Sequence, residues 1–558
     1  MSTTLPKRRG TVAAGETLSQ RQTVLVMIGL MLGMFLSSLD QTIVSTSIYT
    51  IANDLDGLSL QAWATTAYLI TSTVSTPLYG KLSDIFGRRP LYLIAIIIFL
   101  AGSLYAGSVH SMTELAIARG IQGLGAGGLM ALALTIIGDI VALKDRAKFQ
   151  GYFMSVFGIS SVLGPVIGGA FAGSSNILGF DGWRWVFFVN LPIGLAALTV
   201  VFMFLHLPTR HVKQKIDYWG AAAITLAIVP LLLVAEQGRS WGWTSGNSWL
   251  CYGLGVIGII AFLFAERRAG DYALIPLRLF SNITFGLSSL LNFIIGVGMF
   301  GAIAMLPMYL QLVKGLTPTE AGLMMITFTV GILFGSITAG RTISASGTYR
   351  VFPIVGTAIL TAAALVMSFS LHWDTELWVP GLIAVFFGVG LGFCMQPLTL
   401  AMQVSVPAKD MGVGTSTAAF FRSMGGAVGT AVFISMLFSL AADKVASGLK
   451  NAMANPDYLK LLKDPAIASD PANAKLFEFV KKGASNDSLN DTSWLHGANA
   501  QLTQPITDGF AQAIDGVMLT AAILTGIAFL ISFALPNRKL TDPSSGAAPA
   551  DADALPVH

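Results

Sequence analysis

The chain has 558 residues, of which 54% are hydrophobic and only 11% are charged, and its mean hydropathy is +0.70. Soluble domains carry about 25% charged residues, so this composition excludes an ordinary soluble protein and indicates an integral membrane protein. The net charge of +4 gives no sign of nucleic-acid binding. The two cysteines, Cys251 and Cys394, both fall inside apolar runs, which argues against a disulfide framework and against a metal site.

A helix that crosses a bilayer needs roughly 20 largely apolar residues. The run after Gln22 is too long for the core of a signal peptide, so the first span is expected to be retained. The pattern predicts an all-α integral membrane protein with fourteen spans, at about 23–50, 61–80, 91–110, 113–138, 150–172, 185–206, 217–236, 248–266, 283–311, 319–341, 351–371, 377–403, 412–440 and 512–535.

Composition divides the chain into five regions. We expect a polar N-terminal tail at 1–22 and a polar C-terminal tail at 537–558, both with compositions typical of disorder. Two six-helix bundles are predicted at 23–206 and 281–536, separated by two extra spans and their linkers at 207–280. The second bundle contains one long polar loop, at 441–509.

Basic residues are distributed unevenly between the loops. Twenty-one lysines and arginines fall in tails and loops on one side of the predicted membrane, whereas short loops on the other side carry only Arg184, Arg239 and Lys314. Cytoplasmic loops are enriched in Lys and Arg. The sequence therefore predicts a multi-pass protein with both termini in the cytoplasm and the long loop outside.

A charged turn, GKLSDIFGRRP at Gly80–Pro90, joins the second and third predicted spans. A weaker copy, GRTISASG at Gly340–Gly347, keeps the seven-residue glycine spacing but has Ser344 in the place of Asp84. The copy lies 260 residues further along, which fits two repeated six-helix halves separated by two extra helices. Two unrelated glycine turns would also account for the match.

Two charged residues are predicted to lie within the membrane. Asp40 comes late in the first span and Arg119 early in the fourth, followed by Gln122. An uncompensated charge in the bilayer interior costs at least ~2.5–3.5 kcal/mol on insertion scales, so each should face a cavity or a partner. The alternatives are an interfacial acid at the outer end of a long helix and a structural pairing of the arginine with a backbone carbonyl.

The motifs resemble those of the major facilitator superfamily, and within it the fourteen-helix drug:proton antiporter family. The charged turn resembles its motif A, ARGIQGLGAGG (Ala118–Gly128) its motif B, and GISSVLGPVIGGAF (Gly158–Phe171) the antiporter motif C. LDQTIV around Asp40 and WRWVFFVNLPIG (Trp183–Gly194) are also typical of that family, although Gln41 and Ser45 depart from its first-helix motif.

The resemblance implies roles for three groups of residues. Proton coupling would belong to Asp40 and Arg119, and a seal between the halves to the fifth span, through Gly158, Gly164, Pro165, Gly168 and Gly169. A cytoplasmic gate would be formed by Gly80, Asp84, Gly87, Arg88, Arg89 and Asp139, with Asp84 accepting hydrogen bonds from a helix N-terminus and the arginines pairing with Asp139. Packing alone in the fifth span, and a solvated turn that only sets topology, are the plainer interpretations.

Further polar residues inside the spans are candidates for a substrate path, namely Gln122, Asn190, Asn292, Gln396 and Arg422. Acids near span ends, among them Glu236, Glu266 and Glu320, are expected at the interface. A nucleotide-binding GxxxxGK[ST] sequence is missing, and the prediction includes no cofactor and no metal.

The resulting hypothesis is a monomeric, non-enzymatic antiporter that exchanges protons for amphipathic drugs or toxic organic compounds by alternating access in the cytoplasmic membrane. A transporter of one metabolite or lipid with the same fold is the first alternative. The second is a membrane receptor or scaffold, against which the two charges inside the membrane argue. Substrate, stoichiometry and the function of the long loop stay open at this point.

Overall fold

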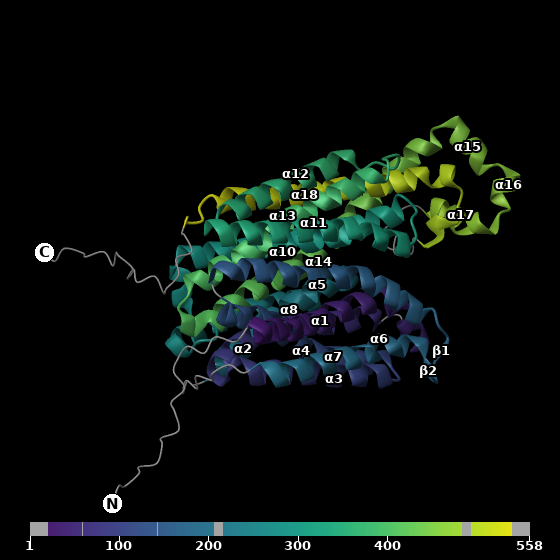
Figure 1. Ribbon diagram of the computed structural model, residues 1–558. Helices are drawn as coiled ribbons and strands as arrows, with labels where there is room; N and C mark the ends of the chain where they lie inside the picture. The colour runs from purple at the N-terminus through teal and green to yellow at the C-terminus, as the bar shows by residue number, and fades with distance from the viewer. Residues whose placement is uncertain (1–19, 58–59, 142, 206–215, 483–492, 538–558) are drawn as a thin grey trace, which may run out of the picture.

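The computed structural model describes residues 20–57, 60–141, 143–205, 216–482 and 493–537, so most of both predicted tails lies outside the described residues. The long helices lie side by side in one bundle (Figure 1). They are α1 (Gln20–Asp54), α2 (Gln61–Phe86), α3 (Arg88–Ser108), α4 (Met112–Ile140), α5 (Leu143–Ala172), α7 (Asn190–Phe204), α8 (Tyr218–Trp241), α9 (Gly246–Ala269), α10 (Ile283–Leu312), α11 (Pro318–Ser346), α12 (Val351–Ser370), α13 (Trp378–Ser405), α14 (Met411–Met453) and α18 (Ala500–Ser532). The short helix α6 (Trp185–Phe188) precedes α7.

Thirteen segments of the described chain are long and apolar enough to cross a membrane. They match thirteen of the predicted spans, with α6 and α7 together forming the sixth. The remaining predicted span is α2, a helix of 26 residues whose many threonines and serines lower its hydropathy. The predicted fold class, an all-α membrane protein with about fourteen spanning helices, is confirmed.

The two ends of the bundle differ. The α2–α3 turn and the η4 turn (Leu277–Ser281) lie at the end where α1 begins and α18 ends, which we call the basic end (Figure 1). The opposite end carries the strand pair β1 (Asn176–Ile177) and β2 (Phe180–Asp181), which are antiparallel, and the short helices α15 (Pro456–Leu462), α16 (Pro465–Ala468) and α17 (Ala474–Lys482). We call this the hairpin end.

The charged turn is shorter than expected. α2 continues to Phe86, six residues past its predicted end, and α3 begins at Arg88, so only Gly87 separates the two helices. Gly87 has φ 95°, a conformation that glycine adopts without steric cost. Asp84 and Arg88 therefore stand on the ends of rigid helices, which fixes where their side chains point.

The prediction of a long polar loop at 441–509 is wrong for most of its described part. α14 extends to Met453, and α18 begins at Ala500. Val445 and Leu449 of α14 belong to one buried apolar cluster with Leu502 and Ile506 of α18. These apolar residues recur at helical spacing among many polar ones, so the average composition of the segment concealed its amphipathic helices.

Buried apolar residues form separate clusters in the two halves of the chain. The largest contains only residues between 291 and 535, and two others contain only residues between 26 and 205. A fourth cluster joins α8 to α2 and α14, with Ile228 and Leu232 packed among Val74 and Phe420. One of the two inserted helices thus lies over the seam between the halves.

Candidate functional site

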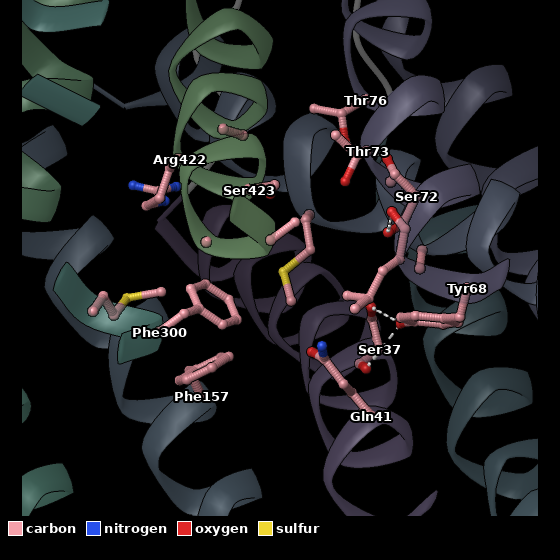
Figure 2. A pocket seen from close by; sticks show the side chains of 18 of the residues that line it. Ser37, Gln41, Tyr68, Ser72, Thr73, Thr76, Phe157, Phe300, Arg422 and Ser423 are labelled. Carbon is pink, nitrogen blue, oxygen red and sulfur yellow. Dashed lines mark hydrogen bonds between the residues drawn. The ribbon is translucent and has the colours of Figure 1, made fainter. Parts of the chain in front are cut away.

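A cavity of about 260 Å³ lies between the two halves (Figure 2). Hydroxyl-bearing side chains of α2, among them Ser72, Thr73 and Thr76, line one side. Arg422 of α14, Phe300 of α10 and Phe157 of α5 lie on the other side. Most of the remaining lining is apolar and includes Met34, Met130, Met299 and Met395. A cavity with these properties suits a molecule that has both apolar and polar parts.

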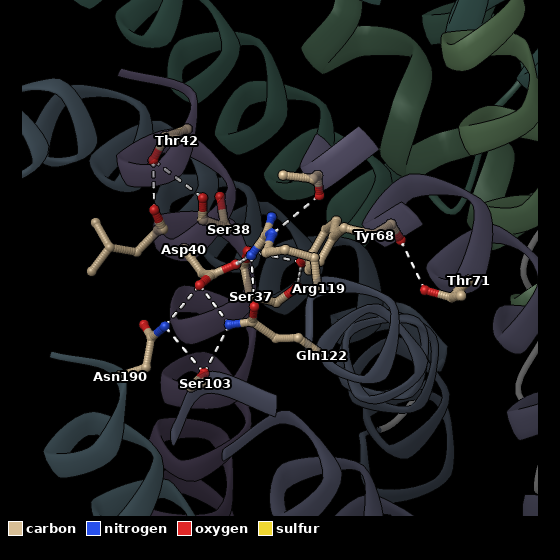
Figure 3. A network of polar contacts seen from close by, with 12 residues as sticks. Ser37, Ser38, Asp40, Thr42, Tyr68, Thr71, Ser103, Arg119, Gln122 and Asn190 are labelled. Atoms are coloured by element: carbon tan, nitrogen blue, oxygen red, sulfur yellow. Dashed lines mark hydrogen bonds and ion pairs between the residues drawn. The ribbon is translucent and has the colours of Figure 1, made fainter. Parts of the chain in front are cut away.

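Asp40 lies beside this cavity in a closed polar network (Figure 3). Arg119 Nη1 lies 2.5 Å from Asp40 Oδ2, and both side chains are almost completely buried. Gln122 Nε2 and Asn190 Nδ2 donate to Asp40 Oδ1 at 2.6 and 2.7 Å, and Ser103 Oγ accepts from both amides. The expectation that the acid and the arginine have partners is met by one shared network, drawn from α1, α3, α4 and α7.

The donors around Asp40 indicate its charge state. Its two oxygens accept three hydrogen bonds, one of them from a guanidinium that cannot lose its proton. Three donors to one carboxyl group, one of them a permanent cation, suit the anionic form of that group. The observed arrangement therefore fits an ionised Asp40, whose charge Arg119 balances inside the bundle.

Tyr68 separates this network from the cavity. Its ring lies 4.2 Å from the Arg119 guanidinium carbon on one side, and the residue lines the cavity on the other. The Tyr68 hydroxyl lies 3.1 Å from Ser37 Oγ, which also lines the cavity. Access from the cavity to Asp40 would thus require Tyr68 to move. The sequence gives no indication of this position, because a tyrosine among the apolar residues of a span carries no distinctive signal.

The glycines of α5 let this helix approach both halves. A Cβ added at Gly164 would lie 2.1 Å from Thr42 Oγ1, and one added at Gly168 would lie 2.8 Å from the Ile43 carbonyl oxygen, both in the helix that carries Asp40. On another face, a Cβ at Gly158 would lie 2.3 Å from Thr329 Cγ2 of α11. A Cβ added at Gly169 would have no atom of the surroundings within 4 Å, so Gly169 takes no part in this close packing.

At the basic end, Asp84 joins the halves. Its carboxylate accepts hydrogen bonds at 3.1 Å from the backbone N–H groups of both Gly412 and Val413, in the first turn of α14. Arg88 Nη1 lies 2.5 Å from Asp84 Oδ1, and Arg88 Nε lies 2.7 Å from Oδ2 of Asp139, at the end of α4. A carboxylate at a helix N-terminus is stabilised by the unpaired N–H groups and the helix dipole, so this contact joins the two halves at the basic end.

Arg89 does not take part in this contact. The expected pairing of Arg89 with Asp139 is wrong, because Arg89 donates to the Phe202 carbonyl oxygen at 2.6 Å and stacks over the Phe202 ring. Successive residues at the start of a helix point about 100° apart. Arg88 therefore faces the interface between the halves, while Arg89 faces α7.

A second ion pair connects the inserted segment to the same helix. Arg278 lies in η4, and its Nη2 is 2.7 Å from Oδ2 of Asp410, the residue that precedes α14. Arg278 Nε is 3.0 Å from Asp271 Oδ1. Lys81 of α2 donates to the Asp271 carbonyl oxygen at 3.3 Å. From the sequence alone Arg278 belongs only to a basic loop, because its partner lies 132 residues away.

The weak copy of the charged turn occupies a related place. α11 ends at Ser346, and Gly347 has φ 69°, so the second glycine of each copy follows a helix with positive φ. Ser344 donates to Asp145 in the first turn of α5, as Asp84 accepts from the first turn of α14. Each copy therefore contacts the first turn of a helix in the other half, but the hydrogen bond of the second copy runs in the opposite direction and involves no buried carboxylate.

Among the five candidates for the substrate path, only Arg422 lines the cavity. Gln122 and Asn190 bind Asp40 instead. Asn292 is buried and donates to the Ser288 carbonyl oxygen, and Gln396 is also buried away from the cavity. Glu236, which was expected at the interface, lines the cavity from α8.

A family profile described as Major Facilitator Superfamily matches residues 30–430. The chain belongs to this superfamily. The multidrug transporter protein MdtP of Bacillus subtilis is 37% identical over 83% of this chain and 82% of its own length. Multidrug resistance protein 3 of the same organism is 32% identical over 78% and 84%, and a tetracycline resistance determinant of Streptomyces rimosus is 39% identical over 57% and 91%.

Solved structures agree on the fold of this superfamily member. The proton:xylose symporter XylE superposes with a TM-score of 0.59 at 15% identity, covering 93% of this chain and 97% of XylE. The human organic anion transporter MFSD10 gives a TM-score of 0.58 at 16% identity, covering 92% and 100%. The chain is thus a multi-pass, non-enzymatic transport protein, with relatives named as multidrug and efflux transporters.

Proposed function

We propose that the protein is a proton-coupled antiporter that exports amphipathic compounds across the cytoplasmic membrane by alternating access. The observation that carries the proposal is the buried Asp40–Arg119 pair next to a central cavity, shielded from that cavity by Tyr68. The names of the relatives support export of drug-like molecules.

Burial makes Asp40 a suitable coupling acid. With Asp40 ionised, the network has no net charge; with Asp40 protonated, Arg119 would be a buried and unbalanced cation. A single unbalanced charge inside a protein costs several kcal/mol. Proton binding therefore favours a conformation in which Arg119 reaches water or another anion, and this ties the proton to a rearrangement of α1 and α4.

The closed basic end supplies the other part of an alternating-access cycle. The distribution of lysines and arginines places the basic end in the cytoplasm, and with it the start of α1 and the end of α18. Release of Asp84 from α14 would open the cavity to that side. Substrate entering from the cytoplasm and a proton entering from outside would then be bound in different conformations of one carrier.

Reconstituted liposomes test the coupling. With a lumen more acidic than the outside, the protein should drive a fluorescent amphipathic dye into the lumen, and the initial rate should rise with the pH difference. Asp40→Asn should reduce this uptake to the level of empty liposomes, because the amide cannot exchange a proton.

Asp181→Asn is the matched control, since Asp181 pairs with Arg184 at the protein surface. Its uptake and its unfolding temperature should equal those of the wild type, whereas Asp40→Asn, which leaves Arg119 unbalanced, should unfold at a lower temperature but stay folded at that of the assay. Gradient-driven uptake by a folded Asp40→Asn protein would overturn the assignment. Wild-type transport that ignores the pH gradient would instead favour facilitated transport of a metabolite or lipid.

A further inference from the structure

Two oppositely charged side chains line the central cavity without binding each other. Glu236 comes from α8 and Arg422 from α14. Within the described residues, neither makes an ion pair or a side-chain hydrogen bond with the protein. The side-chain oxygen atoms of Glu236 and the side-chain nitrogen atoms of Arg422 are not completely buried, so they adjoin open space.

The position of α8 explains how an inserted helix reaches the cavity. Ile224, Ile228 and Leu232 of α8 pack against α2 and α14, over the seam between the halves. Glu236 follows Leu232 by four residues and therefore lies on the same face one turn further on. At the end of α8, Trp243 Nε1 donates to Ser435 Oγ of α14 at 2.9 Å, which fixes the helix in this place.

A charge that faces a mostly apolar cavity is poorly solvated, and a ligand that neutralises it gains a charge-assisted contact. A cationic ligand would satisfy Glu236 but be repelled by Arg422, and an anionic ligand would do the reverse. A ligand with both charges satisfies both residues at once. The methionine and phenylalanine side chains of the lining would contact its apolar part.

We propose that the cavity selects amphipathic zwitterions, with Glu236 binding the cationic group and Arg422 the anionic group. This inference rests on the proposed export function and specifies its substrate class. It also gives the inserted pair α8–α9 a direct function, as the source of one of the two charged contacts.

A four-member ligand series tests the proposal. The parent is a quinolone carboxylic acid with a basic piperazine, a zwitterion at pH 7; its methyl ester is a cation, its N-acetyl derivative an anion, and the doubly blocked compound neutral. Binding is measured calorimetrically on the full-length protein in lipid nanodiscs without a pH gradient. In the wild type, blocking either group should weaken binding about tenfold or more.

The variants assign each charge to its residue. In Glu236→Gln, blocking the amine should no longer matter, while blocking the acid still weakens binding; Arg422→Gln should show the reverse. Glu320→Gln is the matched control, because Glu320 caps α11 outside the cavity and glutamine can serve in the same capping box. Unchanged binding of the neutral compound shows that a variant is folded.

The proposal is overturned if Glu236→Gln weakens all four ligands equally, or if it leaves the effect of blocking the amine intact. Equal affinity of the wild type for the zwitterion and the neutral compound would also overturn it. Because these measurements use no gradient, they are independent of coupling. A protein that binds in the expected pattern but ignores the pH gradient would contradict the antiport proposal alone.

Discussion

Arg278 and Asp410 form an ion pair of 2.7 Å between the turn that follows the inserted helices and the start of α14. Asp410 is almost fully buried, whereas Arg278 is partly exposed. The same first turn of α14 is bound by Asp84 from α2. The inserted segment and the first half of the chain therefore hold one helix end together.

Loss of the Arg278 pair should weaken closure of the basic end. Arg278→Gln removes a partly exposed pair worth about 0.5–1 kcal/mol, so transport should slow by roughly two- to fivefold while ligand affinity changes little. Arg268→Gln, in the same exposed region, is the control and should behave as the wild type. Identical initial rates of dye uptake for both variants at equal protein density would contradict this role.

Loss of the Asp84 carboxylate should have a larger effect. In Asp84→Asn, an amide replaces a buried acceptor of two backbone N–H groups, which costs the closed conformation about 1–2 kcal/mol. Turnover should fall by roughly five- to thirtyfold, with a smaller change in ligand binding. Asp145→Asn alters only the exposed hydrogen bond with Ser344 between the same halves, so it should lower turnover less than Asp84→Asn. The role is refuted if affinity falls and turnover per bound ligand stays constant.

Two adjacent glycines of α5 should respond differently to alanine. A Cβ at Gly168 would clash with α1, whereas one at Gly169 meets nothing within 4 Å. Gly168→Ala should destabilise the protein by about 1–3 kcal/mol, while Gly169→Ala should be neutral or slightly stabilising. Thermal unfolding in detergent measures both. Equal melting temperatures would show that the close approach of α5 to α1 is not needed for stability.

Tyr68 should control proton access to Asp40. Tyr68→Phe keeps the ring against Arg119 and loses only the contact with Ser37, so gradient-driven uptake should stay within about threefold of the wild type. Tyr68→Ala removes the barrier, and proton flux without substrate should rise. A pH-sensitive dye trapped in the liposomes reports this flux. If Tyr68→Ala shows no more proton flux than the wild type, another group closes the path.

The positions of the membrane helices and of the buried charges could be predicted from the sequence. Both are properties of local composition: an apolar run of sufficient length must cross the bilayer, and a charge inside it must be compensated. Asp40 and Arg119 were identified in this way, and the charged turn at Gly80–Pro90 was recognised from its spacing. The amphipathic ends of α14 and α18 were missed because their local composition is polar.

Only the tertiary structure decided which residues meet. Asn190 bonds to Asp40 across 150 positions and Arg278 pairs with Asp410 across 132, and the sequence offers many polar residues for each such partnership. From its place near the end of a span, Glu236 is predicted to be an interfacial acid. Because α8 lies over the seam between the halves, Glu236 lines the cavity instead. The physical reason is that crossing a membrane is governed by each segment alone, whereas a site between helices depends on how separate segments pack.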